Sequence, residues 1–99
     1  MVKLKWSKRD GELVTQNFLV TDKILTHLTK RGFIRSRAMY HSLSDQTTYA
    51  HFRIVKFSHG INLRMYDNRD SVMVVVRPPK EDLYSSNASA KQAAQRLVK

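Results

Sequence analysis

Arginine and aromatic side chains recur at alternate positions in three stretches of the chain, 34–40, 49–57 and 61–66. Guanidinium groups bind phosphate oxygens through two parallel hydrogen bonds, and Tyr or His rings stack on nucleobases. If each stretch is a strand, the alternation places these side chains on one face of a sheet, a surface typical of proteins that bind single-stranded RNA. We therefore expect a face that binds nucleic acid, preferably RNA or single strands, and that consists of Arg35, Arg37, Tyr49, His51, Arg53, Arg64 and Tyr66.

The charge of the chain points to the same class of partner. Eighteen Lys and Arg against eight Asp and Glu give the 99 residues a formal net charge of +10 and a pI near 10.3. Self-repulsion of this size is typical of proteins whose partner is a polyanion or another acidic surface. The expected partner is nucleic acid or a nucleoprotein, with an acidic protein as the alternative. Near the N-terminus, Lys3, Lys5, Lys8 and Arg9 extend the positive field.

Other side chains permit catalytic or metal-binding interpretations. His51 and His59 flank one predicted hairpin, and with Lys56 nearby they would resemble an acid–base pair for phosphodiester transfer. Asp67 and Asp70 have ligand chemistry for a cation, although turn aspartates usually accept hydrogen bonds from their own backbone. Only three glycines are present, and none forms a phosphate-binding loop. We expect no catalytic residue, no metal and no cofactor.

Two segments have the pattern of helices. Residues 22–31 begin at Asp22, a predicted N-cap, and precede Gly32, a predicted left-handed C-cap. The C-terminal helix repeats small and apolar residues from Ala90 onward, with Asn87 or Ser89 as its N-cap.

Alternation with a period of two predicts strands in the first six residues and in 34–40, 49–57, 61–66 and 71–77. The pair Asp10-Gly11 predicts a turn, whereas 12–20 fits either a helix or a second hairpin arm.

These elements predict one α+β domain over residues 1–99. We expect an antiparallel sheet of three to five strands, with both helices packed on one face and the second helix C-terminal. The strand Val72–Val76 is apolar on both faces and should be central or covered. Met73 and Val75 would form an exposed apolar strip, which a homodimer would cover.

The composition also bears on location. The longest apolar run, Val72–Val76, is far shorter than the roughly 18 residues of a membrane span. The sequence has neither the apolar stretch of a signal peptide nor any cysteine. We therefore expect a cytoplasmic protein with no membrane partner.

Part of the chain resembles the RelE/ParE family of small basic toxins, which includes ribosome-dependent mRNA endonucleases. The similar features are the hairpin Phe52-Arg53-Ile54 to Leu63-Arg64-Met65-Tyr66, the apolar strand Val72–Val76, the following Arg77 to Tyr84, and the opening Val2 to Arg9. The resemblance implies that Arg64 and Arg77 stabilise a phosphorane and that Tyr84 is an acid–base residue. Residues 32–48 depart from the family pattern, because they fit a strand and a polar loop rather than a helix.

The segment Ala90–Leu97 is similar to the last helix of double-stranded-RNA-binding domains, and the helix–strands–helix order is similar too. The paired lysines and Gly-Pro loop that clamp a duplex in that family are missing. The sequence most favours a small non-enzymatic domain that docks on nucleic acid. The alternatives are a phage-like inhibitor or adaptor that binds an acidic groove of a host nucleic-acid enzyme, and a RelE-like endonuclease.

Overall fold

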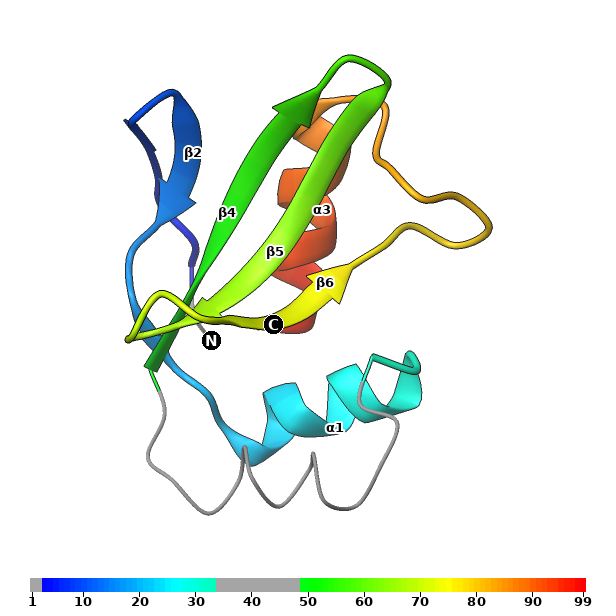
Figure 1. The fold of residues 1–99 in the computed structure, drawn as a ribbon. Helices are drawn as coiled ribbons and strands as arrows, with labels where there is room; N and C mark the ends of the chain where they lie inside the picture. Colours follow the sequence, from blue (N-terminus) through cyan, green and yellow to red (C-terminus); the bar gives the residue numbers. More distant parts are fainter. Residues whose placement is uncertain (1–2, 34–48) are drawn as a thin grey trace.

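The computed structural model describes residues 3–33 and 49–99 (Figure 1). In chain order the elements are β1 (Trp6–Arg9), β2 (Glu12–Thr15), β3 (Phe18–Leu19), α1 (Asp22–Lys30), β4 (Tyr49–Phe57), β5 (Gly60–Asp67), β6 (Val72–Val76) and α3 (Asn87–Leu97). The predicted strand 34–40, with Arg35 and Arg37, lies outside the described residues.

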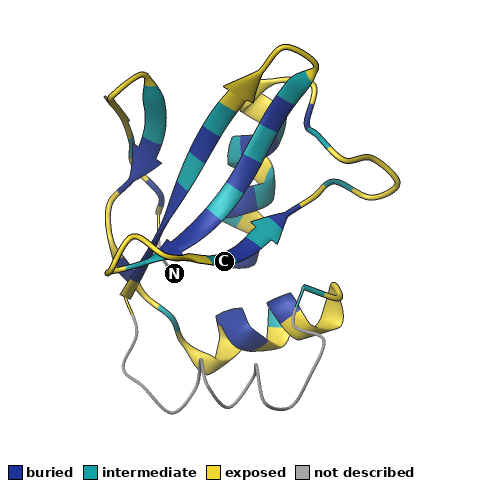
Figure 2. Ribbon diagram, viewed as in Figure 1, coloured by how far each residue is buried: buried dark blue, intermediate teal, exposed yellow. Residues whose placement is uncertain are grey.

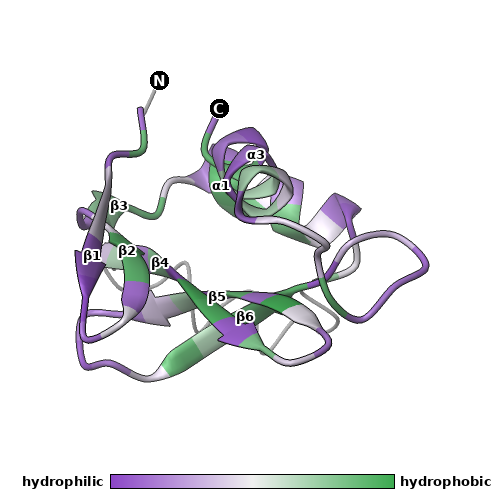
Figure 3. Cartoon of the chain, turned by 90° about the horizontal axis from the view of Figure 1, so that it is seen from above, coloured by the Kyte–Doolittle hydropathy of each residue, from purple (hydrophilic) through white to green (hydrophobic). Residues whose placement is uncertain are grey.

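The strands form one antiparallel sheet in the order β1-β2-β4-β5-β6, and the short β3 pairs with β4 beyond the end of β2. Both helices lie on the same face of this sheet, as the view along it shows (Figure 3). The predicted α+β architecture is therefore confirmed.

Alternation along β4 and β5 builds the core. Ala50, Phe52 and Ile54 from β4, together with Leu63 and Met65 from β5, are buried against the helices (Figure 2). The register pairs Phe52 with Met65 and Ile54 with Leu63, so the two strands present matching apolar rows. The side chains between these rows point to the opposite face, which we call the open face.

Helix α1 supplies Ile24, Leu25 and Leu28 to the core. Its N-cap is Thr21, whose hydroxyl accepts a hydrogen bond from the Ile24 amide, so the predicted cap at Asp22 is wrong by one residue. The predicted C-terminal glycine is confirmed. Gly32 has φ +81°, and the Phe33 amide donates to the Leu28 carbonyl in the pattern of a Schellman motif.

Helix α3 packs closely on the sheet because Ala90 and Ala94 are small and fully buried. Its N-cap is Ser86, not the predicted Asn87 or Ser89, and the Ser86 hydroxyl accepts from the Ser89 amide. Near its end the Leu97 carbonyl lies 3.3 Å from His27 Nδ1 of α1. The two helices thus pack against one sheet and against each other.

The N-terminal strand begins later than predicted. Leu4 is buried in the core but precedes β1. The predicted Asp10-Gly11 turn is confirmed, because both residues have positive φ and Arg9 pairs with Glu12 across it. Residues 12–20, which the sequence left open, contain β2 and β3.

Strand β6 differs from the prediction in two ways. It ends the sheet within the described part of the chain instead of lying at its centre. The register shifts between Met65 and Tyr66, and Met73 packs against the core. Met73 and Val75 are half-buried, so the predicted exposed apolar strip is wrong; Val72, with 48 % exposure, is the exposed residue of this strand.

Gly60 allows β5 to approach the loop before α3, and we predict that Gly60→Ala lowers the free energy of unfolding by about 2–4 kcal/mol. Its φ is +153°, and a Cβ there would lie 2.9 Å from Leu83 Cβ and 3.0 Å from the Tyr84 carbonyl oxygen. Urea denaturation measures the loss. As a control, Gly11→Asn should cost less than about 1 kcal/mol, because Asn tolerates positive φ and open space surrounds that site. Equal losses in the two variants would contradict this packing.

Candidate nucleic-acid interface

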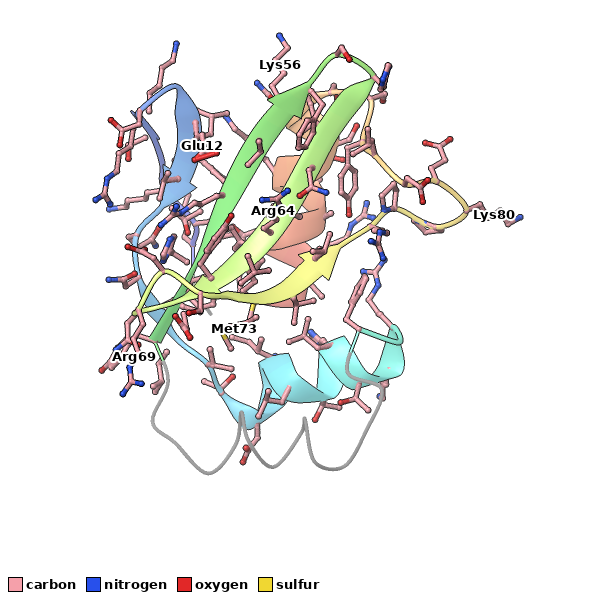
Figure 4. The ribbon with its side chains drawn as sticks, viewed as in Figure 1. Glu12, Lys56, Arg64, Arg69, Met73 and Lys80 are labelled. Atoms are coloured by element: carbon pink, nitrogen blue, oxygen red, sulfur yellow. The ribbon has the colours of Figure 1, made fainter. Side chains whose placement is uncertain are left out.

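Four of the predicted site residues share the open face. His51 pairs with Tyr66 and Arg53 pairs with Arg64 across β4 and β5. Figure 4 shows Arg64 in front of β5, on the side away from α3. The alternation on which the prediction rested therefore does place these side chains together.

Their contacts are mainly with one another. The His51 and Tyr66 rings are stacked with centroids 5.6 Å apart, and the Arg53 guanidinium lies 4.2 Å above the Tyr66 ring. Arg53 also donates to Asp70 Oδ1 at 2.5 Å. Arg64 donates to the Tyr66 hydroxyl at 3.3 Å and to Asn62. The open face thus carries a self-contained polar cluster.

This packing corrects one part of the prediction. His51 is 6 % exposed and Tyr66 is 8 % exposed, so neither ring offers a face on which a base can stack. Arg53 is already paired with a carboxylate. Tyr49, 47 % exposed, is the predicted aromatic residue that remains accessible. The sequence showed the shared face but not that its members bury one another.

Burial and the charge of Arg53 lower the pKa of His51, and the carboxylate of Asp70 partly opposes them. Arg53 Nε–H donates to His51 Nε2 at 3.0 Å, which requires a neutral ring whose proton is on Nδ1. His51 Nδ1 is buried and has no hydrogen-bond partner among the residues described. A neutral imidazole is therefore part of the folded state near pH 7.

A second group of cations lies where two distant segments meet. The residues 3–9 and 87–99 together contain no Asp or Glu. They carry seven cations, which we call the β1–α3 basic surface: Lys3, Lys5, Lys8, Arg9, Lys91, Arg96 and Lys99. All except Lys91, which is half-buried, are exposed.

Two glutamines hold these segments together. Gln95 of α3 accepts a hydrogen bond from the Leu4 amide at 3.0 Å. Gln16 accepts from the Lys5 amide and donates to the Lys3 carbonyl, both at 2.8 Å. The chain before β1 is thereby fixed between the loop after β2 and α3.

The basic side chains converge as a result. Lys3, Arg96 and Lys99 line one shallow cavity of about 480 Å³, with Gln92 and Gln95 completing its wall. Nearby, Lys91 Nζ lies 6.0 Å from the centre of the Trp6 ring. Sequence reasoning included the cations of 3–9 but missed Lys91, Arg96 and Lys99. The absence of acidic residues from both segments was the available signal.

The residues that the RelE/ParE resemblance implied are not brought together. Tyr84 is buried in the core on the helix side, where burial raises the pKa of its hydroxyl. Arg64 projects from the open face, so the sheet separates it from Tyr84. Arg77 is exposed beyond β6.

Two smaller alternatives also fail on geometry. His51 lies six strand positions away from the Phe57–Gly60 pair that flanks His59, so the two imidazoles do not face each other. Asp67 Oδ1 accepts from the amides of Arg69 at 2.8 Å and Ser71 at 2.9 Å, which is the ordinary role of an aspartate in a turn.

The lowered pKa of His51 makes stability depend on pH. Between the folded-state pKa and the unfolded value near 6.5, the unfolded chain binds more protons, so stability rises with pH. The His51 contribution is complete above pH 6.5 and is lost as pH falls through the folded-state pKa. We predict that His51→Gln flattens this acid-side decline in urea unfolding measured from pH 7.5 to 5, whereas exposed His59→Gln leaves it unchanged. The same decline in wild type and His51→Gln would contradict the assignment.

Comparison of the chain with protein-family models, with curated proteins and with solved structures finds no match. Neither helix of the described segments is long and apolar enough to cross a membrane. Any function must therefore be argued from the geometry and charge of this chain itself.

Proposed function

We propose that this protein binds nucleic acid, and that the β1–α3 basic surface contacts the phosphates. The observation that carries the proposal is the meeting of two segments that contain seven cations and no acidic residue. Cations held close together without carboxylates repel one another, and a row of phosphates relieves that repulsion while releasing counterions.

The surroundings of these cations support the assignment. In the described part of the chain, the ion pairs are those that Asp70 makes with Arg53 and His51, so the seven side chains have no protein carboxylate as partner. Gln92, Arg96 and Lys99 follow one another at spacings of four and three residues, which places them on one face of the helix. Such a face can follow a phosphate backbone.

The open face has a smaller role than the sequence suggested. Its arginines are engaged with Asp70, Tyr66 and Asn62, and its two central rings are buried. We assign the phosphate contacts to Lys3, Lys5, Lys8, Arg9, Lys91, Arg96 and Lys99. Tyr49 stays a candidate for base stacking.

The test is fluorescence anisotropy with labelled single-stranded RNA, duplex RNA and duplex DNA at several salt concentrations. We expect affinity to fall steeply with salt, by roughly one logarithmic unit per logarithmic unit of salt for each phosphate neutralised. The double substitution Arg96→Gln and Lys99→Gln should reduce the magnitude of that slope by roughly two.

The matched control removes the same charge elsewhere. Lys56 and Lys80 lie at two separate tips of the molecule, away from α3 (Figure 4). The double variant Lys56→Gln and Lys80→Gln should keep the wild-type slope. Equal effects of the two double variants would mean that net charge, and not this surface, drives binding. No binding at low salt would overturn the proposal and favour an acidic protein as the partner.

A further inference from the structure

A polar cavity of about 350 Å³ lies beside the β1–α3 basic surface, between β2 and the turn that joins β5 to β6. Arg9 belongs to both the surface and the cavity. The wall also includes Asn17, Asn68 and Asp70, and His51 contributes its buried ring. A strand bound on the basic surface would therefore pass the mouth of this cavity.

Hydrogen-bonding groups around the cavity are unused. The Arg9 guanidinium and the side-chain amides of Asn17 and Asn68 have no partner among the described residues. Asp70 uses Oδ1 for Arg53, which leaves Oδ2 as an acceptor. His51 Nδ1 adds an unpartnered buried donor. Donors and acceptors without partners are the features of a site that recognises a polar ligand.

The balance of charge disfavours a phosphate in this cavity. Arg9 and Asp70 have opposite charges, and His51 is neutral because its pKa is lowered. The smaller hollow next to it adds Arg53 but also Asp10 and Glu12. A neutral ligand with donors and acceptors on separate edges fits this arrangement better than an anion does, and a nucleobase is such a ligand.

We propose that the cavity binds an unpaired guanine of the nucleic acid held on the β1–α3 basic surface, an inference that rests on the proposed function. Arginine recognises the O6 and N7 acceptors of guanine through two hydrogen bonds. The free Oδ2 of Asp70 accepts from the N1–H or the exocyclic N2 amine, which the other DNA bases do not present in this combination with two acceptors. Asn17 and Asn68 supply further polar contacts around the base.

The experiment uses labelled ten-nucleotide thymidylate strands that differ only at one central position, which is guanine, adenine, cytosine or abasic. Anisotropy at constant salt should show at least about five-fold tighter binding of the guanine strand than of the abasic strand. Asn68→Ala and Asp70→Asn should each reduce that preference while leaving the affinity for the abasic strand unchanged. Asn suits position 70 because φ there is +60°. Asn87→Ala, at an exposed amide on α3 outside the cavity, should keep the full preference.

The outcomes separate the two proposals. Equal affinity for the guanine and abasic strands, with the salt dependence intact, would overturn the base site and leave nucleic-acid binding standing. Tighter binding of the adenine or cytosine strand would overturn the assignment of guanine. Failure of every strand to bind at low salt would overturn the proposed function, and the base site with it.

Discussion

The pairing of β4 with β5 is the constraint on which the rest of the structure depends. It matches apolar rows on one face, where Phe52 pairs with Met65, and polar rows on the other, where His51 pairs with Tyr66. A slip of one residue would exchange the two faces and place Arg53 among the helices. Both the core beneath α1 and α3 and the polar cluster on the open face follow from this register.

The second constraint is the attachment of the N-terminal segment to α3. The hydrogen bond from the Leu4 amide to Gln95 joins residues that are 91 positions apart. It brings two segments of purely positive side chains together, at a cost in repulsion that the buried contacts of Leu4 and Leu97 offset. A protein that maintains such a surface is suited to a partner with regularly spaced negative charge.

Local pattern explains what was predictable. The strands 49–57 and 61–66, the Asp10-Gly11 turn and the role of Gly32 depend on neighbours in the sequence, and the structure agrees with all of them. The burial of His51 and Tyr66 depends on how Arg53 and Asp70 close over them, which alternation does not describe. The position of Met73 depends on a register shift opposite Met65, which has no marker such as glycine.

The candidate site shows the same division. The cations of residues 3–9 could be identified by type, but their partners on α3 could not, because the contact is set by two glutamines from distant segments. Ser86 as the cap of α3 was missed since several neighbouring residues, Asn87 and Ser89 among them, can serve equally well by type. The choice among them depends on where the preceding loop reaches the sheet through Tyr84 and Ile61.

The most direct test of the account is a map of backbone amide shifts by NMR as a short single-stranded RNA is titrated into the protein at low salt. The account predicts that the largest changes fall in residues 3–9 and 91–99 and continue to Asn17 and Asn68. Changes concentrated instead around Arg77 and Lys80, or spread evenly over every exposed cation, would contradict it.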